Sequence, residues 1–229
     1  MSSGAKQLVQ IAKETVIGTV PSPFARQTLA FTDISLNQSV EKTESASITD
    51  NRLQQSSMIT SAEYSGELSA EAQYGAYDDL MAAAAFNAWA TNVLTFGGTT
   101  RQTFSVLLGY TDIANYHTFS GLHVNTFGID IPEAGLIGLT FGFMGTKRTT
   151  AAVAPVGTIT PASTNPRMSN ISVGDLLVDG TSVKGTACIT AFSFNWDNSM
   201  QVRKCLGAGL EVGAILEMSA KGTGSFTMA

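Results

Sequence analysis

Charged side chains are scarce in this sequence. Asp, Glu, Lys and Arg make up 14% of the 229 residues, well below the quarter that is usual in soluble domains. A protein with so little charge either exposes many Ser, Thr and Gly residues or buries much of its surface against partners. The mean hydropathy of +0.13 is high for a free monomer, and 44% hydrophobic residues suffice for a sizeable core.

Cysteine patterns and long apolar runs are also missing. The two cysteines, Cys188 and Cys205, form no CxxC or zinc-ligand pattern, which argues against a disulfide framework and a metal site. The N-terminus lacks the apolar run of a signal peptide. The longest apolar stretch, at residues 80–86, is far too short to span a bilayer. We therefore expect a protein made in the cytoplasm that has no membrane segment.

Catalytic motifs are absent. No GxSxG, Walker or HExxH pattern occurs, and the two histidines, His117 and His123, lie six residues apart in a strand-like segment. A lone strand histidine is more often a hydrogen-bonded or surface residue than a ligand or base. Aromatic and basic residues do not alternate, so sequence-specific nucleic-acid binding has no support. We expect no enzyme activity, no catalytic residue, no metal and no cofactor.

The most informative stretch is Ser65–Trp89. Apolar and polar residues alternate from Glu67 to Tyr74, which predicts a strand with one buried face. Its polar face carries Glu67 and Glu71. Gly75 ends this strand, and a helix is predicted near residues 78–89. In that helix Asp78 is the expected N-cap, and the expected core-facing residues are Leu80, Met81 and Trp89.

Short apolar strands and turn signals fill the rest of the chain, so the fold class is predicted to be mainly β. We expect an N-terminal arm over residues 1–24 and a single domain over residues 25–229. Residues 37–61 are polar and poor in apolar side chains, which predicts a long loop between two strands. Loops of that length are usually functional or disordered.

Several blocks of the sequence resemble the major tail tube proteins of long-tailed bacteriophages. The first is EAQYGAYDDLMAAAAF, which is similar to that family's alternating strand, Tyr-Gly-x-Tyr-Asp-Asp-Leu turn and short Ala-rich helix. The second holds the family's signatures at Gly109–Asp112, Phe119–Asn125 and Phe141–Gly145. Lys13-Glu14-Thr15, with Gly18-Thr19 before proline, is a weaker third block.

The resemblance implies a β-sandwich or barrel protomer with one flanking helix. It also implies six-membered rings that stack into a hollow tail tube, the conduit for DNA ejection. The implied partners are further copies of the chain and the tape measure, tail terminator and distal tail proteins, while DNA passes without sequence-specific binding. The family usually continues past the last block, so either a short protomer or a further part beyond Ala229 is expected.

A second hypothesis is a carbohydrate- or receptor-binding β-sandwich of a tail tip or fibre. That function would need an exposed aromatic platform, for which Trp89 and Trp196 are the candidates.

Within the tail tube hypothesis, residues of two regions are predicted to have functional roles. Glu67 and Glu71 are predicted to face the lumen, because DNA must slide past a polar and acidic wall. The long loop is predicted to contact the neighbouring ring, through six candidate residues: Ile48, Asp50, Arg52, Leu53, Met58 and Ile59.

Overall fold

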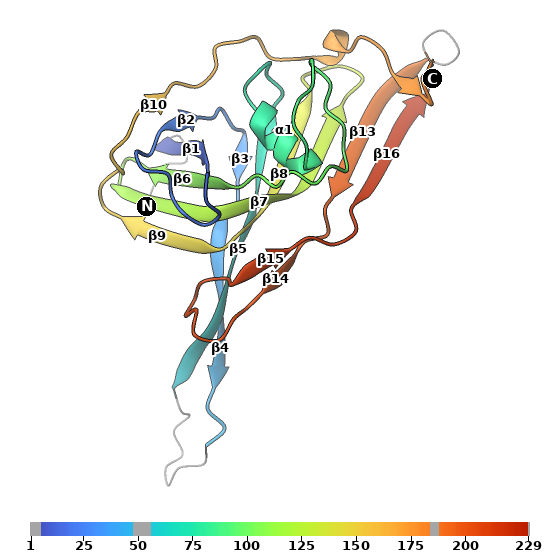
Figure 1. Cartoon of the computed structure of the whole chain (residues 1–229). Helices are drawn as coiled ribbons and strands as arrows, with labels where there is room; N and C mark the ends of the chain where they lie inside the picture. Colours follow the sequence, from blue (N-terminus) through green and yellow to red (C-terminus); the bar gives the residue numbers. More distant parts are fainter. Residues whose placement is uncertain (1–5, 48–55, 184–187, 229) are drawn as a thin grey trace.

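The computed structural model describes residues 6–47, 56–183 and 188–228. These residues form a twelve-stranded sheet, two small two-stranded sheets and a single α-helix. The predicted mainly β class with one short helix is confirmed. In Figure 1 the large sheet curls around the helix like part of a barrel.

The sheet is organised around β7 (Asn115–Ile131), which is long enough to pair with different strands along its two halves. Its first half pairs with β6 (Phe104–Tyr110) and β9 (Lys147–Ala151). Its second half pairs with β8 (Gly138–Gly145) and β13 (Ile189–Asp197). Because one strand serves both groups, the sheet bends at β7 and encloses the core (Figure 1).

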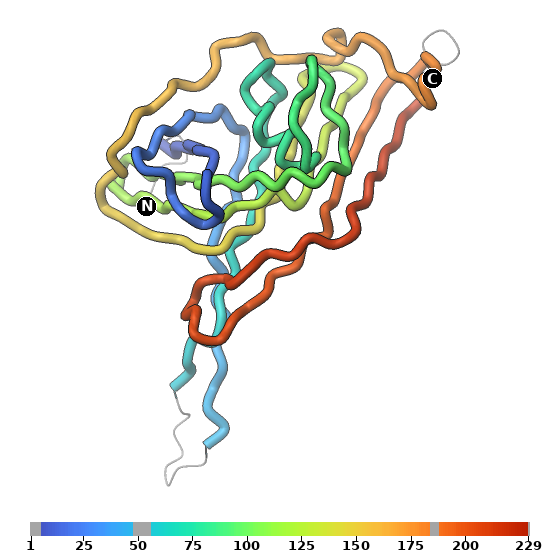
Figure 2. The backbone as a smooth tube through the Cα atoms, viewed as in Figure 1, coloured from blue at the N-terminus to red at the C-terminus, as the bar shows by residue number. Residues whose placement is uncertain are grey.

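Each half of β7 leads outward to further strands. On the β6 side, the sheet continues through three strands: β1 (Gln7–Lys13), β2 (Arg26–Thr28) and β10 (Ile159–Thr160). On the β8 side it continues through β5 (Ser57–Glu71), which pairs with β3 (Asp33–Ile34) and β4 (Asn37–Glu44). On the β13 side it ends at β16 (Lys221–Met228). The first strand of the chain, β1, and the last, β16, therefore lie on opposite sides of the molecule (Figure 2).

Two smaller sheets complete the fold. One joins β11 (Leu177–Val178) to β12 (Thr181–Ser182), after a 3-10 turn at Asn170–Ser172. The other joins β14 (Gln201–Arg203) to β15 (Ala214–Leu216) and lies beside the base of the β4–β5 hairpin (Figure 1). Within β15, Ile215 is buried against the core.

The helix α1 (Asp78–Ala85) closes the concave side of the sheet. It lies against β7 and buries Leu80 and four alanines, whose small side chains allow a close approach. The core below it contains Tyr77, Phe141 and Phe127. The ring centroid of Phe141 lies 6.1 Å from that of Tyr77 and 5.4 Å from that of Phe127. The helix ends four residues earlier than predicted, because Phe86 adopts a left-handed conformation (φ 53°) and stops it.

Two predicted segment boundaries were wrong. From residue 6 onward, the predicted N-terminal arm is not separate from the domain, since β1 lies inside the sheet between β2 and β6. Residues 37–61 are not a loop over their described part, since β4 and the start of β5 pair with each other in an antiparallel hairpin. The hairpin projects from the body of the protein (Figure 1). Sequence periodicity missed it because most of its side chains are polar or exposed on both faces.

A buried carboxylate fixes the turn after β1. Glu14 accepts hydrogen bonds from the Gly18 amide (2.8 Å), Thr103 Oγ1 (2.8 Å), Ser105 Oγ (2.6 Å) and the Gly121 amide (2.9 Å). Four donors around one carboxylate compensate for its removal from water. The charge therefore joins the N-terminal turn, β6 and β7 at one point.

Candidate assembly surfaces

One face of the sheet is polar and uncovered. In β5, Leu68 and Ala70 point into the core, whereas Glu67, Ser69 and Glu71 lie on the opposite face. Strand register continues this face across β5, β8, β7, β13 and β16. Its residues form three rows: Glu67, Gly142, Thr126, Asp197 and Lys221; Ser69, Thr140, Gly128, Asn195 and Thr223; Glu71, Gly138, Asp130, Ser193 and Ser225. We call these fifteen residues the polar face.

The polar face is acidic and built from small side chains. Its acids are Glu67, Glu71, Asp130 and Asp197, and Lys221 is the basic residue in these three described rows. Arg167 reaches Glu71 from a neighbouring loop and forms an ion pair with it. A phosphate backbone would therefore meet mostly carboxylates and hydroxyls here, which bind it weakly.

At Gly142 on the polar face, a neighbouring side chain of the same chain leaves no room for a Cβ. A Cβ on Gly142 would lie 2.1 Å from Oγ1 of Thr126, its cross-strand neighbour. Glycines on one face of a strand often let another backbone approach closely. In the structure the space at Gly142 is filled by a threonine of the same chain.

Both lateral edges of this part of the sheet are free of strand partners among the described residues. β16 pairs with β13 alone, and all eight of its residues are exposed. The opposite edge is formed by β3 and β4, which pair with β5. Six antiparallel strands make up this part of the sheet, in the order β4, β5, β8, β7, β13 and β16, and the first and last of them form its edges. Unpaired edges of this kind are templates for association with another chain.

The end of the β13–β16 strand pair at Ile189 and Met228, called its tip here, also exposes apolar side chains. Phe226 pairs with Phe192, and Phe226 and Met228 are 51% and 57% exposed. Nearer the body, Phe194 and Trp196 pack against Phe96, with centroids 5.4 and 5.1 Å away. A hollow of about 890 Å³ lies beside the tip and is lined by Ile131, Leu176, Val183, Ile189 and Phe192, among others. Exposed apolar surface of this extent is typical of an interaction site.

The projecting hairpin holds two of the predicted inter-ring residues. Met58 is 73% and Ile59 is 50% exposed, and neither side chain joins the core. The other four predicted residues, Ile48, Asp50, Arg52 and Leu53, lie outside the described residues.

The residues predicted for the helix differ in their surroundings. Leu80 is buried and Met81 is partly buried against the core. The cap prediction for Asp78 was wrong, because Tyr77 occupies the N-cap and no side chain caps the helix. Asp78 is the first helical residue, and burial followed by the nearby Asp79 carboxylate raises its pKa. Trp89 lies beyond the helix and is 40% exposed, so its assignment to the helical core face was also wrong.

The ring N–H of each tryptophan is hydrogen-bonded within the chain. Trp89 donates its ring N–H to the Asp78 carbonyl at 2.9 Å, and Trp196 donates to Asn198 Oδ1 at 2.9 Å while its ring packs on Phe96. The carbohydrate-binding hypothesis, which needs an exposed aromatic platform, therefore gains no support from these two residues.

In the described ranges no three His, Cys, Asp or Glu side chains are close enough together to hold a metal ion. His123 is buried beside the Gly121 carbonyl (3.0 Å) and its pKa is lowered by burial. His117 contacts Thr150 Oγ1 at 3.0 Å, and burial lowers its pKa too. None of the helices in the described part of the chain is long and apolar enough to cross a membrane.

Sequence reasoning missed two polar centres. Glu14 appeared only as part of a weak motif, and its burial depends on residues from β6 and β7 that are distant in sequence. Lys204 was not singled out, although it contacts both strands of the projecting hairpin. No local pattern marks such residues, because all their partners except Gly18 lie more than eighty residues away.

The chain matches the family described as "Phage tail tube protein" over residues 4–229. No curated protein matches it. Among solved structures, one similar chain comes from "Cryo-EM structure of the anti-feeding prophage (AFP) baseplate, 6-fold symmetrised" and is 13% identical. The similarity covers 66% of this chain and 97% of that chain, with a TM-score of 0.45. A second comes from "Cryo-EM Structure of an Extracellular Contractile Injection System, PVC sheath-tube complex in extended state". It is 12% identical over 67% of this chain and 93% of that chain, with a TM-score of 0.42.

Because the match spans almost the whole sequence, the protein belongs to the phage tail tube protein family. It is a structural component of a phage tail, and the family resemblance read from the sequence is confirmed.

Proposed function

We propose that copies of this chain form six-membered rings, and that these rings stack into the tail tube through which DNA is ejected. The observation that carries the proposal is the uncovered polar face, which runs between two unpaired sheet edges. The number six comes from the family resemblance. The tape measure, tail terminator and distal tail proteins remain the expected partners at the two ends of the tube.

Ring closure would join β16 of one copy to the β3–β4 edge of the next. With the two edge strands included, six antiparallel strands run from one edge to the other, so β16 runs opposite to β4 of an identically oriented neighbour. The new pair would therefore be antiparallel, like the rest of the sheet. A rotational repeat of one interface closes into a ring and leaves no free edge.

The polar face would line the lumen. The sheet curls so that helix α1 and the strands β1 and β6 lie on the side opposite to the polar face, and they make that side the bulkier one (Figure 1). In a closed ring the bulkier side has more room on the outside, which leaves the polar face inside. Carboxylates and hydroxyls on the wall would limit phosphate contacts, because affinity for DNA grows with each cation that neutralises a phosphate. Glu67 and Glu71 thus remain the predicted lumen residues.

Stacking would use the projecting hairpin, which extends beyond the body and ends in the predicted inter-ring segment. The exposed Met58 and Ile59 would supply apolar contacts to the next ring. Ile48, Asp50, Arg52 and Leu53, which lie outside the described residues, keep their predicted role as inter-ring contacts.

Electron microscopy of the purified protein, alone and with tail extracts, tests the proposed function. We expect hollow tubes of stacked rings. Dispersed particles in both conditions would contradict the proposal.

Cross-linking tests the choice of edges. Ser39→Cys on β4 and Thr223→Cys on β16 would be combined in one chain, in a background that lacks Cys188 and Cys205, and the protein brought to assembly conditions. We expect a ladder of cross-linked species up to six copies with a short bifunctional thiol reagent. Thr149→Cys on β9, paired with Thr223→Cys, is the matched control and should give no ladder.

A further inference from the structure

The outer part of the β4–β5 hairpin lacks support from the sheet. β8 pairs with β5 only from Tyr64 to Glu71. The residues of β5 that precede Tyr64 pair only with β4, and the residues of this two-stranded part are mostly exposed. An isolated two-stranded ribbon is marginally stable in water. Something other than sheet pairing must therefore set the angle at which this hairpin leaves the body.

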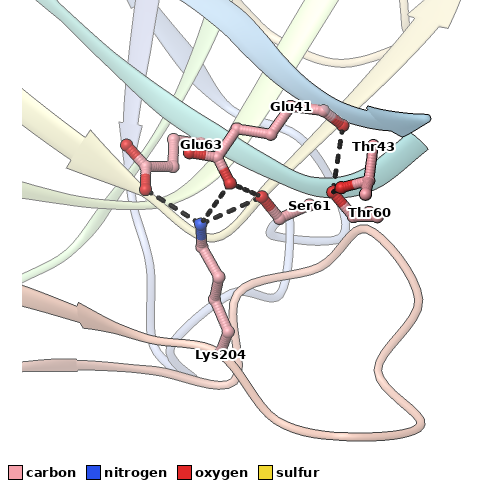
Figure 3. Close-up of polar contacts among 6 residues, drawn as sticks. All are labelled: Glu41, Thr43, Thr60, Ser61, Glu63 and Lys204. Atoms are coloured by element: carbon pink, nitrogen blue, oxygen red, sulfur yellow. Dashed lines mark hydrogen bonds and ion pairs between the residues drawn. The ribbon is translucent and has the colours of Figure 1, made fainter. Parts of the chain in front are cut away.

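Lys204, just after β14, lies against both strands of the hairpin (Figure 3). Its Nζ is 3.0 Å from Glu63 Oε1, 3.0 Å from Ser61 Oγ and 3.6 Å from Glu41 Oε2. The Ser61 hydroxyl also donates to Glu41. Strand register places Glu41, Ser61 and Glu63 on one face of the hairpin. Without Lys204 the two carboxylates would repel each other at this point.

The segment that follows Lys204 is fixed at its far end too. The Tyr64 hydroxyl donates to the Leu210 carbonyl at 3.0 Å, and Lys147 pairs with Glu211 at 2.5 Å. The Val212 amide donates to the Thr146 carbonyl at 2.9 Å, and the Val212 side chain is buried. Residues 204–212 are thus anchored on the hairpin at one end and on the β8–β9 corner at the other. We call this segment the brace.

The electrostatics agree with this geometry. The hydrogen bond from Ser61, followed by the charge of Lys204, lowers the pKa of Glu41. The hydrogen bond to Glu63 raises the pKa of Lys204. Lys204 contacts two carboxylates, so the contact is an ion-pair network rather than a chance approach of one flexible side chain. Networks of this kind contribute more than isolated surface pairs.

We propose that the brace holds the projecting hairpin at a preset angle, with Lys204 as its positioning residue. The hairpin is then already ordered when it meets a second copy. The second half of this inference rests on the proposed stacking of rings. A preorganised hairpin loses less conformational entropy on contact, which strengthens association. Local stability of the hairpin in the unassembled protein is the direct consequence.

Lys204→Met tests the inference, because it removes the charge and keeps much of the aliphatic side chain. Lys42→Met is the matched control, since Lys42 is exposed on β4 and pairs opposite Ile59 rather than with the brace. In unassembled protein we expect amide hydrogen exchange at residues 37–44 and 57–63 to become about three- to tenfold faster in Lys204→Met. We expect no change in Lys42→Met, and no change in β6 of either variant.

Exchanging the charges of Lys204 and Glu63 distinguishes an effect of the ion pair from the simple loss of a side chain. Lys204→Glu alone should accelerate exchange in the hairpin further than Lys204→Met, and adding Glu63→Lys should restore much of the protection. Lys204→Met should also raise the protein concentration at which tubes form. Unchanged hairpin exchange in Lys204→Met would overturn the inference, whether or not tubes form. Faster exchange without tubes in any variant, wild type included, would support the brace and contradict the proposed function.

Discussion

Two strands of nearly equal length show how differently this chain treats its two regions. All but one of the seven residues of β6 are buried, between β1 and β7 and below the helix. All eight residues of β16 are exposed, although Phe226 and Met228 are as apolar as many core residues. The body buries its apolar strands, whereas β16 and the β4–β5 hairpin have surfaces that the described part of the chain does not cover. This difference points to contacts between copies, and the following predictions test it.

Truncation of a phenylalanine should give opposite outcomes in the two regions. Phe141 is fully buried between Tyr77 and Phe127, so Phe141→Ala should lower the free energy of unfolding by about 3–5 kcal/mol. Phe226→Ala, at the exposed position, should cost less than about 1 kcal/mol in the unassembled protein. Urea denaturation measures both. The Phe226 variant should nevertheless assemble poorly, and normal tubes from it would separate β16 from assembly.

Removal of the buried carboxylate should rank next. Glu14→Ala leaves four hydrogen-bond donors without their acceptor, which should cost about 3 kcal/mol of unfolding free energy. Glu67→Ala is the control, because Glu67 is exposed on the polar face, and it should change stability by less than about 0.5 kcal/mol. Equal effects of the two substitutions would mean that the Glu14 contacts contribute little.

The pH dependence of stability should reflect the buried histidine. Burial lowers the pKa of His123 below its ordinary value of about 6.5, so the unfolded chain binds the proton first as the pH falls. Stability should be fully present above pH 6.5 and decrease as the pH falls through the interval down to the folded-state pKa, by at most about 1.4 kcal/mol per pH unit. His123→Gln should flatten this part of the profile.

His117→Gln supplies the comparison, since His117 is only half-buried and its pKa shift has the same direction. It should flatten the profile less than His123→Gln. A larger effect at His117 would contradict the assignment of the pH dependence to the buried ring.

The smallest effect on stability should come from added charge on the polar face. Ser69→Lys and Thr140→Lys alter adjacent positions of one row, and should change unfolding free energy by less than about 0.5 kcal/mol. Tubes built from the double variant should bind DNA more tightly than wild-type tubes, with an affinity that falls as salt rises. Binding equal to that of wild type would place the polar face away from the lumen.

The parts of the fold that the sequence predicted are those with a clear local period. Leu68, Ala70 and Ala72 alternate with polar residues and are buried as expected, and the short motif from Tyr74 to Leu80 marked the start of the helix. The β4–β5 hairpin was missed because it has no buried face to create a period. Trp89 was misplaced because the left-handed residue Phe86 ends the helix, and helical spacing alone does not reveal that turn.

The candidate surfaces were predictable only in part. Glu67 and Glu71 could be placed on a polar strand face, but the polar face itself depends on register with β8, β7, β13 and β16. The contact of Lys204 with Glu41 and Glu63 joins residues more than 140 positions apart, so it depends on the folded topology.

Amide hydrogen exchange of the same protein before and after assembly tests the central claim most directly. The account predicts that Lys221–Met228 and Asn37–Glu44 gain protection together when rings form, while Phe104–Tyr110 stays equally protected in both states. Tubes in which Lys221–Met228 exchanges as fast as in the unassembled protein would contradict it.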